Sequence, residues 1–208
     1  MLKGILLSGG VCAMFALGAV AHADTITGSL TSGLTCSTAS PCGTITVTDN
    51  GSGGVTVTES LAPNFFVVTG NGTNHVSLAM DLDVAGLTAA NFSLPTFWTF
   101  GTNATPAGFS GDYDYFVQFA DPNCSGSSCT GGHTEPNSVT FTISGVSTAN
   151  FDLSGFPFVS DINVAGATGN VGATGSSVPT PAPEPSSLAL LGTGVLGAAG
   201  VIRRRFRA

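Results

Sequence analysis

Apolar residues alternate with threonine in two neighbouring runs of this sequence. Residues 43–49 read GTITVTD and residues 54–59 read GVTVTE, so a β-branched apolar residue stands at every second position. A period of two separates side chains onto the two faces of a strand, whereas a helix would scatter them around its axis. Residues 49–53, DNGSG, are typical turn residues, and the two runs therefore predict a β-hairpin.

Similar alternation further along the chain predicts an all-β fold. Residues 76–84 place apolar side chains on one face and Ser77, Asp81 and Asp83 on the other, and residues 139–143 repeat the pattern. No stretch of the body has the periodicity of an amphipathic helix. We therefore expect residues 24–165 to form a single β-sandwich-like domain.

One nine-residue pattern occurs twice, each time after an alternating run. Residues 86–94 read GLTAANFSL, and residues 145–153 read GVSTANFDL. Two copies of one strand-turn element are too few for a solenoid and suggest two equivalent halves of one domain. Phe92 and Phe151 hold the same place in the two copies, and both are expected to close an end of the core.

Residues 1–23 have the features of a secretory signal peptide. Lys3 supplies an early positive charge, an apolar stretch follows, and the small residues AHA precede Asp24. This A-x-A pattern predicts cleavage between Ala23 and Asp24 during export. A permanent N-terminal anchor is the alternative, but the apolar stretch is short and contains glycine.

The C-terminal region changes composition twice. Residues 166–182 are mostly Gly, Ala, Thr, Ser and Pro, which predicts a flexible spacer. Residues 186–202 are uncharged, and as a helix at about 1.5 Å per residue they would measure roughly 25 Å, just enough to span a bilayer. The cluster of Arg203, Arg204 and Arg205 is expected to stay in the cytoplasm, which leaves the body outside. A plain membrane anchor would have the same features.

Three features follow one another at the C-terminus: Pro183-Glu184-Pro185, a hydrophobic span that contains glycine, and the terminal arginines. This order, over residues 183–208, resembles the PEP-CTERM sorting signal of Gram-negative bacteria. The segment is also described as the ice-binding protein C-terminal domain, a name that is no evidence of ice binding. Residues 158–173 and the paired cysteines resemble a recurrent group of such proteins whose bodies carry no assigned activity.

The resemblance implies a route through the cell envelope. The precursor would be anchored in the inner membrane, where exosortase, a membrane cysteine transpeptidase, would cut it at or near the Pro-Glu-Pro motif. The released protein would pass to the cell surface or the extracellular matrix. The hydrophobic span would then be a transient anchor.

Basic residues are confined to the two terminal segments. All five Lys and Arg residues lie before residue 24 or after residue 202, whereas all 12 Asp and Glu residues lie between these bounds. Phosphate backbones and anionic lipids would repel such a body, which argues against nucleic-acid binding. Its stability must come from apolar burial, backbone hydrogen bonds, disulfides or bound cations.

The four cysteines of the body lie in two close pairs, Cys36 with Cys42 and Cys124 with Cys129. Three pairings are open from the sequence alone. Local disulfides are favoured, because each pair encloses a turn-rich loop and an oxidising compartment keeps such bridges closed. A zinc site on the cysteines, alone or with His133, is the alternative, but neither pair has the two-residue spacing usual for zinc.

Acidic pairs are the candidate metal ligands. Asp81 with Asp83, and Asp112 with Asp114, are spaced by two residues, so in a strand each pair points to one face. Converging carboxylate oxygens suit Ca²⁺. A solvated strand face is the alternative, because no EF-hand or repeated Asp-x-Asp pattern is present. We expect no other cofactor.

His75 and His133 are the only histidines of the body, and neither stands beside a nucleophile in a known motif. No G-x-S-x-G, H-E-x-x-H or phosphate-binding glycine loop occurs. The sequence therefore predicts no enzyme. Because triads assemble in space, a deep pocket that joins either histidine to a carboxylate would instead favour a secreted hydrolase.

Two kinds of side chain are candidates for surface recognition. The alternating threonines could form a small regular array like those on ice-binding surfaces, although threonine is also simply a good strand residue. Exposed rings stack on sugars, so exposure of Trp98, Tyr113 and Tyr115 would favour polysaccharide binding, with core packing as the alternative. The threonines of the array are Thr44, Thr46, Thr48, Thr56 and Thr58.

These observations favour an exported, non-enzymatic protein of the cell surface or extracellular matrix, processed by exosortase and associated with exopolysaccharide. A carbohydrate-binding or calcium-binding module is the alternative. A secreted hydrolase and an ice-binding protein are less favoured.

Overall fold

The computed structural model describes residues 24–178 except 71 and 112, all within one compact unit. This part of the chain contains strands and two short 3₁₀ helices but no α-helix, which confirms the predicted all-β domain. The elements in chain order are β1 (Thr25–Ser32), β2 (Gly43–Asp49), β3 (Gly54–Leu61), β4 (Phe65–Val67), β5 (Leu78–Met80), η1 (Ala89–Asn91), β6 (Phe92–Ser93), β7 (Trp98–Ala104), β8 (Tyr113–Phe119), β9 (Cys124–Ser125), β10 (Ser128–Cys129), β11 (Ser138–Ser144), η2 (Thr148–Asn150), β12 (Phe158–Val164) and β13 (Ala167–Val178).

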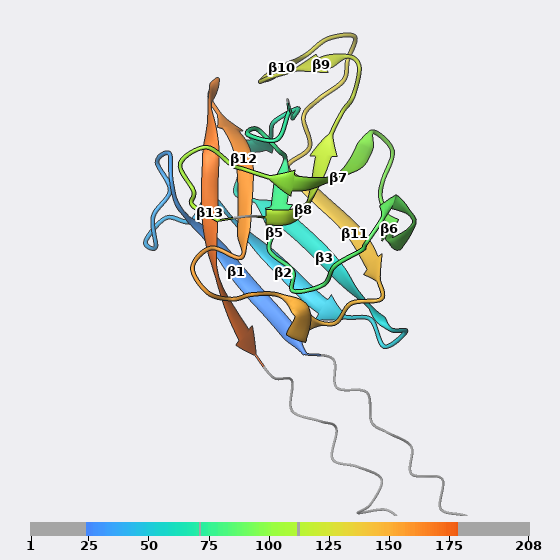
Figure 1. Cartoon of the computed structure of the whole chain (residues 1–208). Coiled ribbons are helices and arrows are strands. Elements are labelled where there is room, and N and C mark those ends of the chain that lie inside the picture. The colour runs from blue at the N-terminus through green and yellow to red at the C-terminus, as the bar shows by residue number, and fades with distance from the viewer. Residues whose placement is uncertain (1–23, 71, 112, 179–208) are drawn as a thin grey trace, which may run out of the picture. The chain divides into compact units, whose positions relative to one another are not determined.

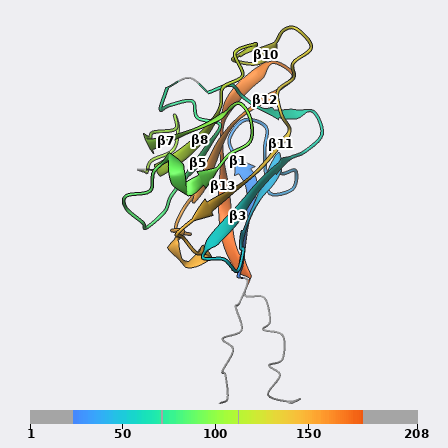
Figure 2. The ribbon, with the colours of Figure 1, turned by 90° about the vertical axis from the view of Figure 1, so that its right-hand side faces the viewer.

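One antiparallel sheet contains every strand except the small hairpin of β9 and β10 (Figure 1). The order is β6-β11-β3-β2-β1-β13-β12-β5-β8-β7, and β4 pairs with β12 beside this path. The two ends of this order meet, because the rings of Phe92 in β6 and Phe100 in β7 lie 4.6 Å apart. The sheet is thus nearly closed into a barrel (Figure 2). Instead of the two stacked sheets of the predicted sandwich, one sheet curls on itself, because strand twist accumulates across it.

Strand β13 lies in the middle of the sheet, although its residues belong to the segment that the sequence predicts to be a spacer. It pairs with β1 on one side and with β12 on the other. The predicted linker is therefore wrong for residues 167–178, and the domain extends beyond residue 165. Small residues are needed here, because a Cβ at Gly172 would lie 2.4 Å from a ring carbon of Phe109 and 2.6 Å from one of Phe156.

The curled sheet encloses the main core. Its largest fully buried apolar side chains include Phe141, Phe158 and Ile26. A second, smaller core covers the outer face of β12, β5 and β8, where Phe109 and Phe156 pack on buried neighbours. The strand predicted over residues 76–84 is therefore shorter than expected: β5 spans three residues, and both of its faces are buried.

The repeated nine-residue pattern forms two matching turns. In the first, Asn91 Oδ1 accepts a hydrogen bond from the Thr88 N–H at 2.9 Å, and in the second Asn150 Oδ1 accepts one from the Ser147 N–H at 2.7 Å. Each turn ends in the phenylalanine singled out above. Both phenylalanines are buried in the main core, as the sequence predicts.

A buried carboxyl group interrupts the apolar interior. Glu59 on β3 is fully buried, and neither of its carboxylate oxygens has a hydrogen-bond partner. The nearby Ser160 hydroxyl donates its hydrogen bond to the Ser77 carbonyl at 2.9 Å and therefore does not donate one to the Glu59 carboxylate. Burial raises the pKa of Glu59 from 4.5 to about 7.

Candidate functional site

The predicted export and sorting residues lie outside the described part of the chain. They are Ala23 at the signal cleavage site, the motif Pro183, Glu184 and Pro185, and the basic cluster Arg203, Arg204 and Arg205. Among residues 24–178, no helix is long and apolar enough to cross a membrane. The predicted span, residues 186–202, also lies outside these residues.

Both local disulfides are present, which confirms the predicted pairing of Cys36 with Cys42 and Cys124 with Cys129. The second disulfide joins β9 to β10 and closes the hairpin that projects at one end of the domain (Figure 1). The cysteines are bonded to each other, so the zinc alternative is wrong for the four thiolates.

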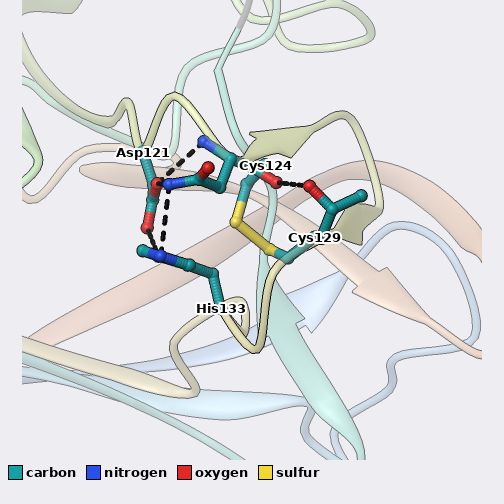
Figure 3. A network of polar contacts seen from close by, with 6 residues as sticks. Asp121, Cys124, Cys129 and His133 are labelled. Carbon is teal, nitrogen blue, oxygen red and sulfur yellow. Dashed lines mark hydrogen bonds and ion pairs between the residues drawn. A yellow bond between two sulfur atoms is a disulfide. The ribbon is translucent and has the colours of Figure 1, made fainter.

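A histidine–aspartate pair that the sequence does not suggest flanks the disulfide-closed hairpin (Figure 3). Nδ1 of His133 lies 2.6 Å from Oδ2 of Asp121, a carboxylate that is 3% exposed. Asn123 completes the group: its backbone N–H and its side-chain amide both donate to Asp121 Oδ1, at 2.9 and 3.1 Å. The same side-chain amide lies 3.2 Å from Nε2 of His133.

These contacts assign the protons of the group. Burial alone would raise the pKa of Asp121, but the hydrogen bonds from Asn123 and His133 hold that pKa below its ordinary value. The ionised carboxylate accepts from Nδ1–H of His133, and in this tautomer Nε2 accepts a hydrogen bond from the Asn123 side-chain amide. A hydrolytic triad needs a nucleophile at this second nitrogen, and here an amide occupies the position.

A pocket of about 280 Å³ lies beside His133. Its lining includes Glu135, a buried residue whose Oε2 accepts a hydrogen bond from Asn163 at 2.9 Å and whose Oε1 has no partner. Burial raises the pKa of Glu135, and the bond from Asn163 opposes this effect. The pocket thus brings a histidine near a carboxyl group, but the hydrogen bonds of His133 go to Asp121 and Asn123.

His75 forms the second histidine–aspartate pair. Its Nδ1 lies 2.9 Å from Oδ2 of Asp161, which is 1% exposed on β12. Burial raises the pKa of Asp161, and hydrogen bonds from His75 and from the Gly169 N–H counteract it. No signal in the sequence joins these residues, because 86 positions separate them along the chain.

The acidic candidates for calcium are only partly brought together. Asp83 and Asp114 line one open pocket, Asp81 is half-buried at the end of β5, and Asp112 lies outside the described residues. Within residues 24–178, no group of three or more His, Cys, Asp or Glu side chains is arranged to hold a metal ion.

The aromatic candidates pack into the fold. Tyr113 and Tyr115 are 3% and 4% exposed, and their hydroxyls donate to backbone carbonyls. Trp98 is half-buried against Phe119, at a ring distance of 5.7 Å. Core packing, the alternative considered for these residues, is what the structure contains, so they form no flat stacking platform for sugars.

The threonines predicted to form an array lie on the hairpin of β2 and β3, which is confirmed. Thr46 faces Thr58, and Thr48 faces Thr56. Sequence reasoning missed that the array continues on both sides, where Thr27 of β1 faces Thr46 and Thr140 of β11 faces Thr58. The signal was present as further Thr and Ser at every second residue, but only the strand order makes them neighbours.

Removal of the hairpin disulfide provides a test of its structural role. We expect Cys124→Ser with Cys129→Ser to lower the free energy of unfolding by about 2 kcal/mol, because the bridge closes a short loop and restricts the unfolded chain. Urea unfolding of oxidised protein measures the loss. Reduction of the wild type should lower it further, since the Cys36–Cys42 bridge then opens as well. An unchanged midpoint in the double variant would contradict a stabilising role.

An all-β body with two disulfides is typical of extracytoplasmic proteins. Comparison with family models matches residues 181–205 to the PEP-CTERM protein-sorting motif. The chain therefore carries the sorting motif of exported proteins that exosortase processes. No curated protein and no solved structure matched the chain.

Proposed function

We propose that this protein is a non-enzymatic component of the cell surface or extracellular matrix, cut by exosortase and retained by exopolysaccharide. The observation that carries the proposal is the PEP-CTERM motif at residues 181–205. The export machinery and exosortase are the processing partners. The hydrophobic span of residues 186–202 holds the precursor at the inner membrane of a Gram-negative cell until the cut is made.

The folded domain ends before the sorting motif begins, which supports removal of the C-terminal segment. Strand β13 ends at Val178, and the Pro-Glu-Pro motif begins at Pro183. A cut at or near the motif leaves every strand pair of the sheet intact. Processing is therefore expected to release the folded domain from its anchor without loss of stability.

The polar contacts of the two histidines support a role without catalysis. His133 is held between Asp121 and Asn123, and His75 is bonded to the buried Asp161. The His75 contact ties a loop to β12, and the His133 contact joins the two segments that flank the β9–β10 hairpin, because a buried carboxylate needs such a partner. Turnover of a substrate by the purified protein, lost in His133→Ala or His75→Ala, would overturn this part of the proposal.

The processing step is tested by the intact mass of the protein from the extracellular and membrane fractions of the producing cells. We expect an extracellular species that begins at Asp24, ends near Glu184 and holds four oxidised cysteines. The variant Glu184→Ala disrupts the motif and should accumulate in the membrane fraction with its C-terminus intact. A wild-type membrane species that keeps Arg203 to Arg205 would instead identify a permanent anchor.

A further inference from the structure

Five neighbouring strands, β13, β1, β2, β3 and β11, lie side by side in the sheet (Figure 1). Their outward positions form a continuous face of hydroxyl side chains. The strand register arranges them in three rows, in which every position is Ser or Thr except the β13 position of the first row, where Val178 pairs with Thr25. We call this surface the hydroxyl face. Its rows are Thr25, Thr48, Thr56 and Thr142; Ser176, Thr27, Thr46, Thr58 and Thr140; and Thr174, Ser29, Thr44, Ser60 and Ser138.

The hydroxyl face is large enough to contact an extended polymer. Neighbouring strands lie about 4.8 Å apart and alternate residues about 6.8 Å apart, so five strands and three rows cover roughly 19 by 14 Å. Opposite the face, the same strands bury Ile26, Val47, Val57 and Phe141 in the main core. The backbone beneath the hydroxyls is therefore held rigidly.

The hydroxyl face is a neutral region on an acidic molecule. No Asp or Glu stands at any position of the three rows, although the body is rich in carboxylates and contains no Lys or Arg. Exposed acids lie on other elements, such as Asp83 after β5 and Asp114 on β8. A neutral partner can approach this face, whereas a polyanion meets the repulsion of the whole body.

Most of these hydroxyls are available to a partner. The hydroxyl oxygens of Thr58 and Thr140 are hydrogen-bonded at 3.1 Å across the strands, and those of Thr25 and Thr48 lie 3.5 Å apart. Within the described residues, the hydroxyls of Thr46 and Thr56 make no hydrogen bond. Each hydroxyl can donate one hydrogen bond and accept two.

We propose that the hydroxyl face is the contact surface for a neutral polysaccharide chain, an inference that rests on the function proposed above. Sugar hydroxyls are donors and acceptors like those of the face, and the threonine methyl groups offer apolar surface to the C–H groups of the sugar rings. Each contact is weak, but repeated contacts along one chain reinforce one another. The face thus retains the protein in a matrix without a deep binding pocket.

The curvature of the sheet favours a polymer over an ice surface. Adjacent strands are rotated by about 20–25°, so the strand direction turns by roughly 80–100° from β13 to β11. A crystal plane matches only a flat array, whereas a flexible sugar chain follows a twisted row. Ice remains an outcome that the experiment distinguishes.

The test compares binding of two double variants, isolated from the extracellular fraction of the producing cells. Thr46→Val with Thr58→Val removes two facing hydroxyls at the centre of the face and keeps residues that suit a strand. Thr99→Val with Thr102→Val is the matched control, because both threonines are exposed on β7, a strand outside the face. The probes are the neutral and acidic fractions of protein-free exopolysaccharide from the same cells.

We expect the wild type and the control to bind the neutral fraction, and the Thr46/Thr58 variant to bind it at least about tenfold more weakly, at an unchanged melting temperature. Equal binding by both variants would overturn the hydroxyl face and leave the proposed function standing. No binding by the wild type would overturn retention by polysaccharide itself. Binding to the acidic fraction alone would overturn a neutral ligand. Inhibition of ice recrystallisation that only the Thr46/Thr58 variant loses would identify an ice surface instead.

Discussion

A chain that stops after Gly166 is expected not to fold, although it keeps the whole domain that the sequence predicts. It lacks β13, which pairs with β1 on one side and with β12 on the other. Loss of this strand divides the sheet and leaves two unpaired edges inside the fold. It also exposes Ile26, Leu30 and Phe158, which are at most 1% exposed in the complete domain. Burial of each contributes about 1.5–3 kcal/mol, which for three residues is comparable to the whole stability of a small domain.

The effect is measured by exporting the truncated chain through its own signal peptide and following protease resistance. We expect rapid degradation and no cooperative thermal transition. A chain that stops after Ala182 is the matched control, since it lacks the sorting segment but keeps β13, and it should melt like the processed protein. A cooperative transition of the shorter chain at the same temperature would show that β13 is not part of the stable domain.

The contrast between β2 and β13 explains how much of the fold the sequence predicts. In β2, Ile45 and Val47 alternate with threonine, so the pattern alone identifies a half-buried strand. In β13, inward positions such as Ala173 and Gly175 are small: Gly175 lies beneath Pro157 and Leu153, where a Cβ would come within 2.9 Å of the proline ring. An alternating pattern of apolar side chains cannot identify such a strand, because β13 is buried by the side chains of neighbouring segments and not by large side chains of its own.

Closure of the sheet and the polar pairs depend on long-range contacts, which a sequence pattern does not contain. The contact between Phe92 and Phe100 closes the curled sheet, yet alternation describes each strand separately. The disulfides were predictable because both partners lie within a few residues of each other. The bond between His75 and Asp161 was not, because only the finished sheet makes the two residues neighbours.

Glu59→Gln is expected to stabilise the protein above neutral pH and to flatten its dependence on pH. Burial raises the pKa of Glu59 from 4.5 to about 7. The folded state therefore binds a proton more tightly than the unfolded state does, so its stability is highest below pH 4.5 and falls as the pH rises toward 7. A shift of this size corresponds to about 3 kcal/mol, and this penalty persists at higher pH. Glutamine keeps the shape of the side chain and cannot ionise.

Urea unfolding between pH 4 and pH 9 measures this effect as the difference between variant and wild type. Other groups contribute to the wild-type profile, since the pKa of Asp161 is raised and that of Asp121 is lowered, but these contributions cancel in the difference. Glu59→Met is a second variant, because an apolar side chain of similar length should also abolish the pH dependence that Glu59 causes and leaves no polar atom at position 59. Asp114→Asn changes an exposed carboxylate on β8 and should leave the stability almost unchanged. Parallel pH profiles for wild type and both Glu59 variants would mean that water reaches this carboxylate in the native fold. A difference that opens between pH 4.5 and 7 would mean that the curled sheet keeps its interior dry around an unpaired acid.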